Sequence, residues 1–178
     1  ELAPCQRGLH ALQARLAKRL QTARTEGMSV AWLAVRAGGS NYLFPLGQSG
    51  EIFPVAGLPS VPYTCGWFPG VLNIRGGLYG VVDLAAFIAA DTATARAEPV
   101  SAEPSVVTLN IALDVNCALQ VDLLLGLRGP EAFTSSTPPA QEGPVYFGTR
   151  FIDASGDAWQ EINMRTLSQT PQFLSISA

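Results

Sequence analysis

Leucines near the N-terminus follow a helical spacing. They recur at intervals of three or four residues, at Leu9, Leu12, Leu16 and Leu20. This spacing places the leucines on one face of a helix, and Gly27 marks its end. The pattern predicts an N-terminal amphipathic helix over residues 1–27. Its apolar face either packs on the rest of the chain, which is the commoner case, or is offered to a partner.

After residue 27 the pattern changes to short runs of β-branched and aromatic residues, separated by glycine-rich and proline-rich turns. Runs of this length and composition predict strands. In the first half we expect strands over residues 30–36, 42–46, 51–55, 71–74 and 78–82. In the second half we expect strands over residues 107–113, 118–125, 145–152 and 158–162. The sequence therefore predicts a mainly β protein.

The segments between these strands predict a helix, a linker and a loop. Asp83 is a suitable N-cap for a short helix that continues to Ile88. Residues 91–105 lack large apolar side chains and contain two prolines, which is typical of a linker. Residues 128–143 are rich in proline, serine and threonine, and we expect an irregular loop there.

The order of these parts repeats along the chain. Residues 68–84 contain an aromatic residue and a glycine, a strand, a glycine turn, a second strand and a polar cap, and residues 146–164 follow the same order. This repetition predicts two similar modules, one over about 28–90 and the other over about 106–178, joined by the linker.

Composition narrows the classes of function. Charged residues make up 14% of the chain, against about 25% in an average soluble protein. Between residues 37 and 95 they are only Glu51, Arg75, Asp83 and Asp91. Such a surface suits contact with other proteins. A net charge of −3 argues against a nucleic-acid partner.

The hydrophobic runs and the cysteines bear on membrane insertion and on the compartment. No apolar run approaches the roughly 18 residues of a membrane span, so no direct membrane insertion is expected. The cysteines, Cys5, Cys65 and Cys117, form an odd set without a Cys-x-x-Cys motif. A reducing, cytoplasmic compartment is the better fit.

The residues that usually carry catalysis are scarce. His10, the one histidine, lies in the predicted N-terminal helix, and no phosphate-binding glycine loop or Cys/His metal motif occurs. We therefore expect no enzyme, cofactor or metal. A rival hypothesis is an enzyme with paired carboxylates, which needs a carboxyl group with a raised pKa in a cleft. Its candidates are Asp83, Asp114, Asp122, Asp153, Asp157 and Glu161, and each also suits a turn or a helix cap.

Arg75 is the strongest candidate for a contact residue. Alternation along 72–75 places Asn73 and Arg75 on one face of a strand. An arginine in a nearly neutral surface is a natural hot spot, because it combines a charge, a planar fork and an apolar stem. The alternative is that Arg75 pairs internally with Glu51 or Asp83. The sequence leaves both possibilities open.

The same region carries a family resemblance. The run Gly70-x-x-Asn73-x-Arg75-Gly76, followed by Val81-Val82-Asp83-Leu84 and preceded by Ser49-Gly50-Glu51-Ile52, resembles the signature of the CheW-like chemotaxis coupling proteins. The leucine-rich N-terminus and the segment Trp159-x-x-Ile162-x-Met164 resemble the twitching-motility members of that family. The resemblance covers about residues 28–178.

The resemblance implies a fold and a function. It implies two intertwined five-stranded SH3-like barrels, to which the N-terminal helix is added. It also implies a non-enzymatic adaptor that couples the regulatory domain of a CheA-type histidine kinase to a methyl-accepting chemotaxis receptor, at cytoplasmic receptor arrays. The residues expected to bind partners are Glu51, Gly70, Asn73, Arg75 and Gly76. The rival from another class is a free-standing β-barrel that binds a small ligand or another pilus or signalling component.

Overall fold

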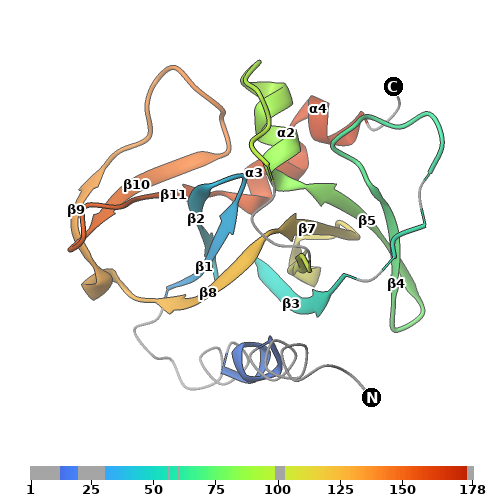
Figure 1. Cartoon of the computed structure of the whole chain (residues 1–178), viewed down its shortest axis with the longest axis horizontal. Helices are drawn as coiled ribbons and strands as arrows, with labels where there is room; N and C mark the ends of the chain where they lie inside the picture. Colours follow the sequence, from blue (N-terminus) through green and yellow to red (C-terminus); the bar gives the residue numbers. More distant parts are fainter. Residues whose placement is uncertain (1–12, 20–30, 56, 60, 99–102, 176–178) are drawn as a thin grey trace.

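Two curled β-sheets make up most of the protein. The computed structural model describes residues 13–19, 31–55, 57–59, 61–98 and 103–175 (Figure 1). The strands are β1 (Trp32–Ala37), β2 (Ser40–Pro45), β3 (Ser49–Pro54), β4 (Gly70–Ile74), β5 (Gly77–Asp83), β6 (Ser105–Leu109), β7 (Cys117–Val121), β8 (Leu123–Arg128), β9 (Phe133–Thr137), β10 (Phe147–Asp153) and β11 (Ala158–Ile162). The helices are α2 (Leu84–Asp91), α3 (Met164–Gln169) and α4 (Pro171–Leu174), with 3-10 turns η1 (Ile111–Leu113) and η2 (Pro130–Ala132).

The two sheets repeat one topology. The six-stranded sheet has the order β8-β1-β2-β11-β10-β9, and the five-stranded sheet has the order β3-β6-β7-β5-β4. In both sheets the third and fourth strands pair in parallel, as β2 with β11 and β7 with β5. The other pairs are antiparallel. β9 therefore has no counterpart in the five-stranded sheet.

The sheets are intertwined, as the family resemblance implies. The six-stranded sheet takes β1 and β2 from the first half of the chain and its other strands from the second half. The five-stranded sheet takes β3, β4 and β5 from the first half and β6 and β7 from the second. Because each half contributes strands to both sheets, neither half alone can complete a sheet.

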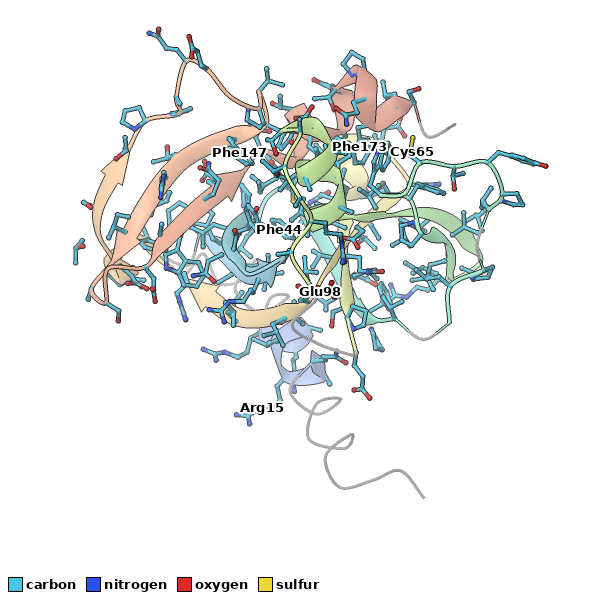
Figure 2. The ribbon with its side chains drawn as sticks, turned by 45° about the horizontal axis from the view of Figure 1, so that its top comes forward. Arg15, Phe44, Cys65, Glu98, Phe147 and Phe173 are labelled. Atoms are coloured by element: carbon cyan, nitrogen blue, oxygen red, sulfur yellow. The ribbon has the colours of Figure 1, made fainter. Side chains whose placement is uncertain are left out.

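Central strands are buried on both faces. In β1, Leu33 and Val35 point into a large core shared by the two sheets, whereas Ala34 points into a smaller cluster with Trp159. Strands alternate in this way because successive side chains point to opposite faces. Phe44 of β2 is fully buried in the shared core, between the sheets (Figure 2). One face of these strands therefore packs in a core shared by both sheets, and the other face packs in a smaller cluster within the sheet itself.

Matching caps end the last strand of each repeat. Asp83 begins α2 and Asn163 begins α3, and each side chain accepts a hydrogen bond from the amide three residues later, at 3.1 and 3.0 Å. Each cap also donates its own amide to an aromatic residue's carbonyl, which belongs to Trp67 in one repeat and Tyr146 in the other. The duplication thus extends to single hydrogen bonds.

Residues 13–19 form a helix that lies against the sheets (Figure 1). Leu16 is buried beside Gly126 of β8, and the Gln13 side chain donates to the Ser105 hydroxyl at 2.7 Å. Leu16 thus follows the commoner alternative, an apolar face packed on its own protein. Arg15 is exposed and points away from the sheets (Figure 2). The other leucines of the stripe lie outside the described residues.

The prediction of an irregular loop over 128–143 is wrong. This segment contains η2 and then β9, which pairs antiparallel with β10 and places Ser136 opposite Phe151. β9 consists of one aromatic residue followed by threonines and serines, and those four are exposed. It lacks the apolar alternation that identifies a strand, and its strand conformation depends on pairing with β10.

Two predicted strands are also divided differently. The run 118–125 breaks at Asp122, so β7 joins the five-stranded sheet and β8 the six-stranded one. The Asp122 amide donates to Arg36 O at 2.9 Å, and its carboxylate accepts from the Gly38 amide at 2.9 Å. The run 107–113 is shifted, because β6 ends at Leu109 and η1 follows. The Asn110 amide, directly after β6, donates to Gln48 O at 2.8 Å, so hydrogen bonds to distant residues accompany both boundaries.

The predicted linker is shorter than 91–105. α2 includes Asp91, β6 begins at Ser105, and residues 92–98 form neither helix nor strand. Arg96 ties this segment to the first module, because its guanidinium lies 2.6 Å from the carboxylate of Asp83.

Candidate docking site

Four of the five predicted contact residues lie together at one end of the five-stranded sheet. β3 and β4 are the two edges of this sheet. Arg75 in the β4–β5 turn reaches Glu51 on β3, with 2.7 Å between Arg75 Nη1 and Glu51 Oε1. The ion pair therefore joins the two edges of the curled sheet. Gly70 is not part of this group, because it is buried at the other end of β4, opposite Val81.

The turn that carries Arg75 has an unusual backbone. Ile74 pairs with Gly77, so Arg75 and Gly76 form a two-residue turn. Their φ angles are +51° and +82°, and positive values at both positions are the signature of a type I′ turn, which favours asparagine and glycine. Asn73 stabilises the turn, since its side-chain oxygen accepts from the Gly76 amide at 3.1 Å.

Stability alone does not explain an arginine at this position. The left-handed conformation costs a residue with a Cβ about 1–2 kcal/mol. The ion pair contributes at most about 1 kcal/mol to stability, because the side chains of Arg75 and Glu51 are 75% and 40% exposed to solvent. A positive φ at an exposed, charged residue makes Arg75 a candidate contact residue.

The structure shows the internal partner of Arg75. It pairs internally with Glu51, and yet most of its side chain faces solvent. Asp83 is not its partner, because that carboxylate caps α2 and pairs with Arg96. Arg75 is thus held in place without being buried.

A depression of about 270 Å³ with a mixed polar and apolar lining contains the ion pair at its edge. Phe53 of β3, Tyr79 of β5 and Ile111 of η1 contribute to its lining, and Ile111 is 91% exposed. Ile111 is not among the contact residues expected from the sequence, because it falls within the predicted strand 107–113. The signal that could have found it is Asn110, whose side chain accepts from the Ala112 amide at 2.9 Å and so caps η1. A fixed cation beside exposed apolar side chains is typical of a protein-binding hot spot.

Other chemistry finds little support in the described part of the chain. No group of three or more His, Cys, Asp or Glu residues there could hold a metal ion. The one carboxyl group there with a resolved pKa shift is Asp153, whose pKa is lowered, mainly because Trp159 Nε1 donates to it at 2.9 Å. This is the opposite of the raised pKa that the paired-carboxylate hypothesis requires. None of the described helices is long and apolar enough to span a membrane.

Comparison with known proteins identifies the family. The family model of the CheW-like domain matches residues 31–148. The chain belongs to the CheW-like family. This span contains the Glu51–Arg75 pair and every strand except β11 and most of β10. Family membership therefore agrees with the resemblance carried by the Asn73-x-Arg75-Gly76 motif.

Two relatives extend the match beyond this CheW-like segment. Protein PilI of Pseudomonas aeruginosa is 25% identical over 167 residues, covering 92% of this chain and 89% of PilI. The crystal structure of the scaffolding protein TtCheW from Thermoanaerobacter tengcongensis superposes with a TM-score of 0.62 and 13% identity, covering 82% of this chain and 96% of that one. The second comparison establishes the shared fold. Together with the family match, they support an adaptor role in chemotaxis-like signalling.

Proposed function

We propose that this CheW-like protein is a non-enzymatic adaptor that couples a CheA-type histidine kinase to a methyl-accepting chemotaxis receptor. The likeness to PilI favours the pathway of type IV pilus twitching motility. In this role the protein works in the cytoplasm at receptor arrays, with one surface for the regulatory domain of the kinase and another for the receptor tip.

The observation that carries the proposal is the conformation of Arg75. Its backbone lies in the left-handed region, its guanidinium is oriented by Glu51, and its side chain is three-quarters exposed. A guanidinium fixed in this way has lost part of its rotamer freedom before a partner arrives, which lowers the entropic cost of binding. Arg75 Nη1 donates to Glu51, and among the described residues no other side chain is seen bonded to the guanidinium, so its remaining N–H groups can donate to a carboxylate or carbonyl of the partner.

Substitution of Arg75 separates binding from folding. We expect Arg75→Ala to weaken binding of the kinase regulatory domain or of the receptor tip by about 30-fold, which corresponds to a hot-spot contact of about 2 kcal/mol. Arg75→Asn should weaken binding as much and yet leave the melting temperature unchanged or slightly raised, because asparagine suits the positive φ. Isothermal titration calorimetry and thermal melts on the same samples measure both quantities.

Two further variants sharpen this test. Arg75→Lys keeps the charge and removes the planar fork, so loss of binding in this variant shows that geometry matters. Arg150→Ala is the matched control, since it removes an exposed arginine from β10 in the other sheet. Normal binding of both partners by Arg75→Ala and Arg75→Asn would remove Arg75 from the site. Failure of the wild-type protein to bind either partner would refute the adaptor proposal itself.

A further inference from the structure

β3 contains a β-bulge at the point where it carries Glu51. Between Ser49 and Ile52 the pairing advances three residues along β3 but two along β6. Gly50 and Glu51 of β3 therefore lie opposite a single residue of β6, Thr108. Such two-against-one arrangements bend a strand and redirect the side chains beside them, and they are common next to functional sites. The motif Ser49-Gly50-Glu51-Ile52 thus folds as a bulge.

The bulge decides which way Glu51 points. Ser49 and Ile52 are both buried, at 0% and 7% exposure, although they are three residues apart. In a regular strand, side chains two residues apart share a face, so Glu51 would lie on the buried face of Ser49. The extra residue reverses this alternation. Glu51 therefore lies at the surface, where its carboxylate is 2.7 Å from Arg75 Nη1.

The hydroxyl of Thr108 holds the bulge in place. The Glu51 amide donates to Thr108 Oγ1 at 2.7 Å, and Thr108 is 6% exposed. A bulge disrupts the ladder of backbone hydrogen bonds, and the hydroxyl supplies an acceptor for the amide of the bulged residue. Because Glu51 is fixed through its backbone, its side chain leaves the strand in a defined direction.

Gly50 leaves room for this hydrogen bond. A Cβ added to Gly50 would collide with the Thr108 hydroxyl, and it would lie 2.8 Å from Leu109 O. A side chain at this position would therefore push β3 away from β6 or displace the hydroxyl. Gly50 and Thr108 also contribute to the lining of the depression that contains Arg75. The bulge is thus part of the docking site and not a remote feature of the sheet.

We propose that Gly50 and Thr108 are positioning residues of the docking site. Gly50 allows the close approach of β3 and β6, Thr108 fixes the backbone of Glu51, and the Glu51 carboxylate orients the Arg75 guanidinium. An orientation set in the free protein lowers the entropic cost of binding. This inference deepens the proposed function and rests on it, because the benefit is realised when a partner binds Arg75.

Removal of the Thr108 hydroxyl tests the proposal. Thr108→Val keeps the branched shape, and it should weaken binding of the partner that Arg75→Ala affects by about fivefold, the factor that one ordinary hydrogen bond supplies. Thr108→Ser keeps the hydroxyl and should bind like the wild-type protein. In a double-mutant cycle, Thr108→Val should add no further loss to Arg75→Ala, because Thr108 acts through Arg75. Isothermal titration calorimetry measures all four proteins.

Ser105→Ala is the matched control for this series. It removes another buried hydroxyl from β6, at 3% exposure, and it should leave binding unchanged. Thermal melts of every variant separate a loss of stability from a loss of positioning. A loss of binding in Thr108→Val that persists undiminished in the Arg75→Ala background would overturn the proposal, because additive losses would mean that the two residues act independently.

A second measurement needs no partner. Nitrogen-15 relaxation at Arg75 Nε in the free protein reports the mobility of the guanidinium. Thr108→Val and Glu51→Ala should both increase this mobility, and so should Gly50→Ala, which leaves Thr108 itself unchanged. Unaltered mobility in Thr108→Val and Gly50→Ala would overturn the positioning role. If the wild-type protein binds neither partner, the adaptor proposal fails, and the relaxation measurement still decides whether the bulge positions Arg75.

Discussion

The contact between the Gly38-Gly39 turn and α2 offers a sharp test of the intertwined fold. Both glycines have positive φ, +55° and +78°, and they connect β1 with β2 in the six-stranded sheet. A Cβ added to Gly38 would lie 2.8 Å from the Cβ of Ala85 in α2. A Cβ added to Gly39 would meet no atom within 4 Å. The two positions therefore share a backbone requirement and differ in packing.

This difference sets the expected cost of each alanine substitution. Gly39→Ala places a Cβ in the left-handed region, at about 1–2 kcal/mol, and alanine's lower entropy in the unfolded chain offsets about 0.4–1 kcal/mol of that. Gly38→Ala bears the same net cost of about 1 kcal/mol and adds about 1–3 kcal/mol for overpacking. We expect Gly38→Ala to destabilise the protein by about 2–4 kcal/mol. The difference between the variants corresponds to roughly 2–12 °C in melting temperature for a chain of this size.

Urea denaturation with calorimetric melts measures both variants against the wild-type protein. A double-mutant cycle with Ala85→Gly assigns the extra cost to its source, because removal of the Ala85 Cβ makes room for the new methyl group. The cost of Gly38→Ala should then approach that of Gly39→Ala. Equal destabilisation by the two single substitutions, or no rescue by Ala85→Gly, would show that the turn does not pack on α2 as described.

The remaining predictions concern the N-terminal helix and the cysteines. Leu16→Ala should lower the free energy of unfolding by about 2–5 kcal/mol, because Leu16 is 6% exposed, whereas Arg19→Ala on the exposed face should change it little; equal melts for the two variants would mean that the helix is not packed. Burial raises the pKa of the Cys117 thiol to about 12, so iodoacetamide at pH 8 should label the half-buried Cys65 first and Cys117 only on unfolding. Peptide mass mapping follows both sites, and early labelling of Cys117 would contradict its placement in the core.

Local patterns in the sequence predict most of the regular structure. Short β-rich runs such as 30–36, bounded by glycine and proline turns, predict strands, because β-branched and aromatic side chains suit the surface of a sheet. The caps Asp83 and Asn163 are equally local, since each side chain bonds to an amide three residues away. Repetition of these signals is sufficient to predict a duplicated β protein, and the Asn73-x-Arg75-Gly76 motif locates the tip of the candidate site.

Contacts between distant residues decide the rest. β9 has no apolar pattern of its own and becomes a strand only because β10 pairs with it. At Asp122 the chain passes from β7 in one sheet to β8 in the other, and this break depends on hydrogen bonds to Arg36 and Gly38, more than 80 residues earlier. The partner of Arg75 is likewise chosen by curvature, because closing the five-stranded sheet brings Glu51 to 2.7 Å while Asp83 is taken by α2 and Arg96. The sequence determines which side chains are apolar or charged and so require burial or an ionic partner. Several residues could meet each requirement, and the tertiary structure decides which of them is in contact.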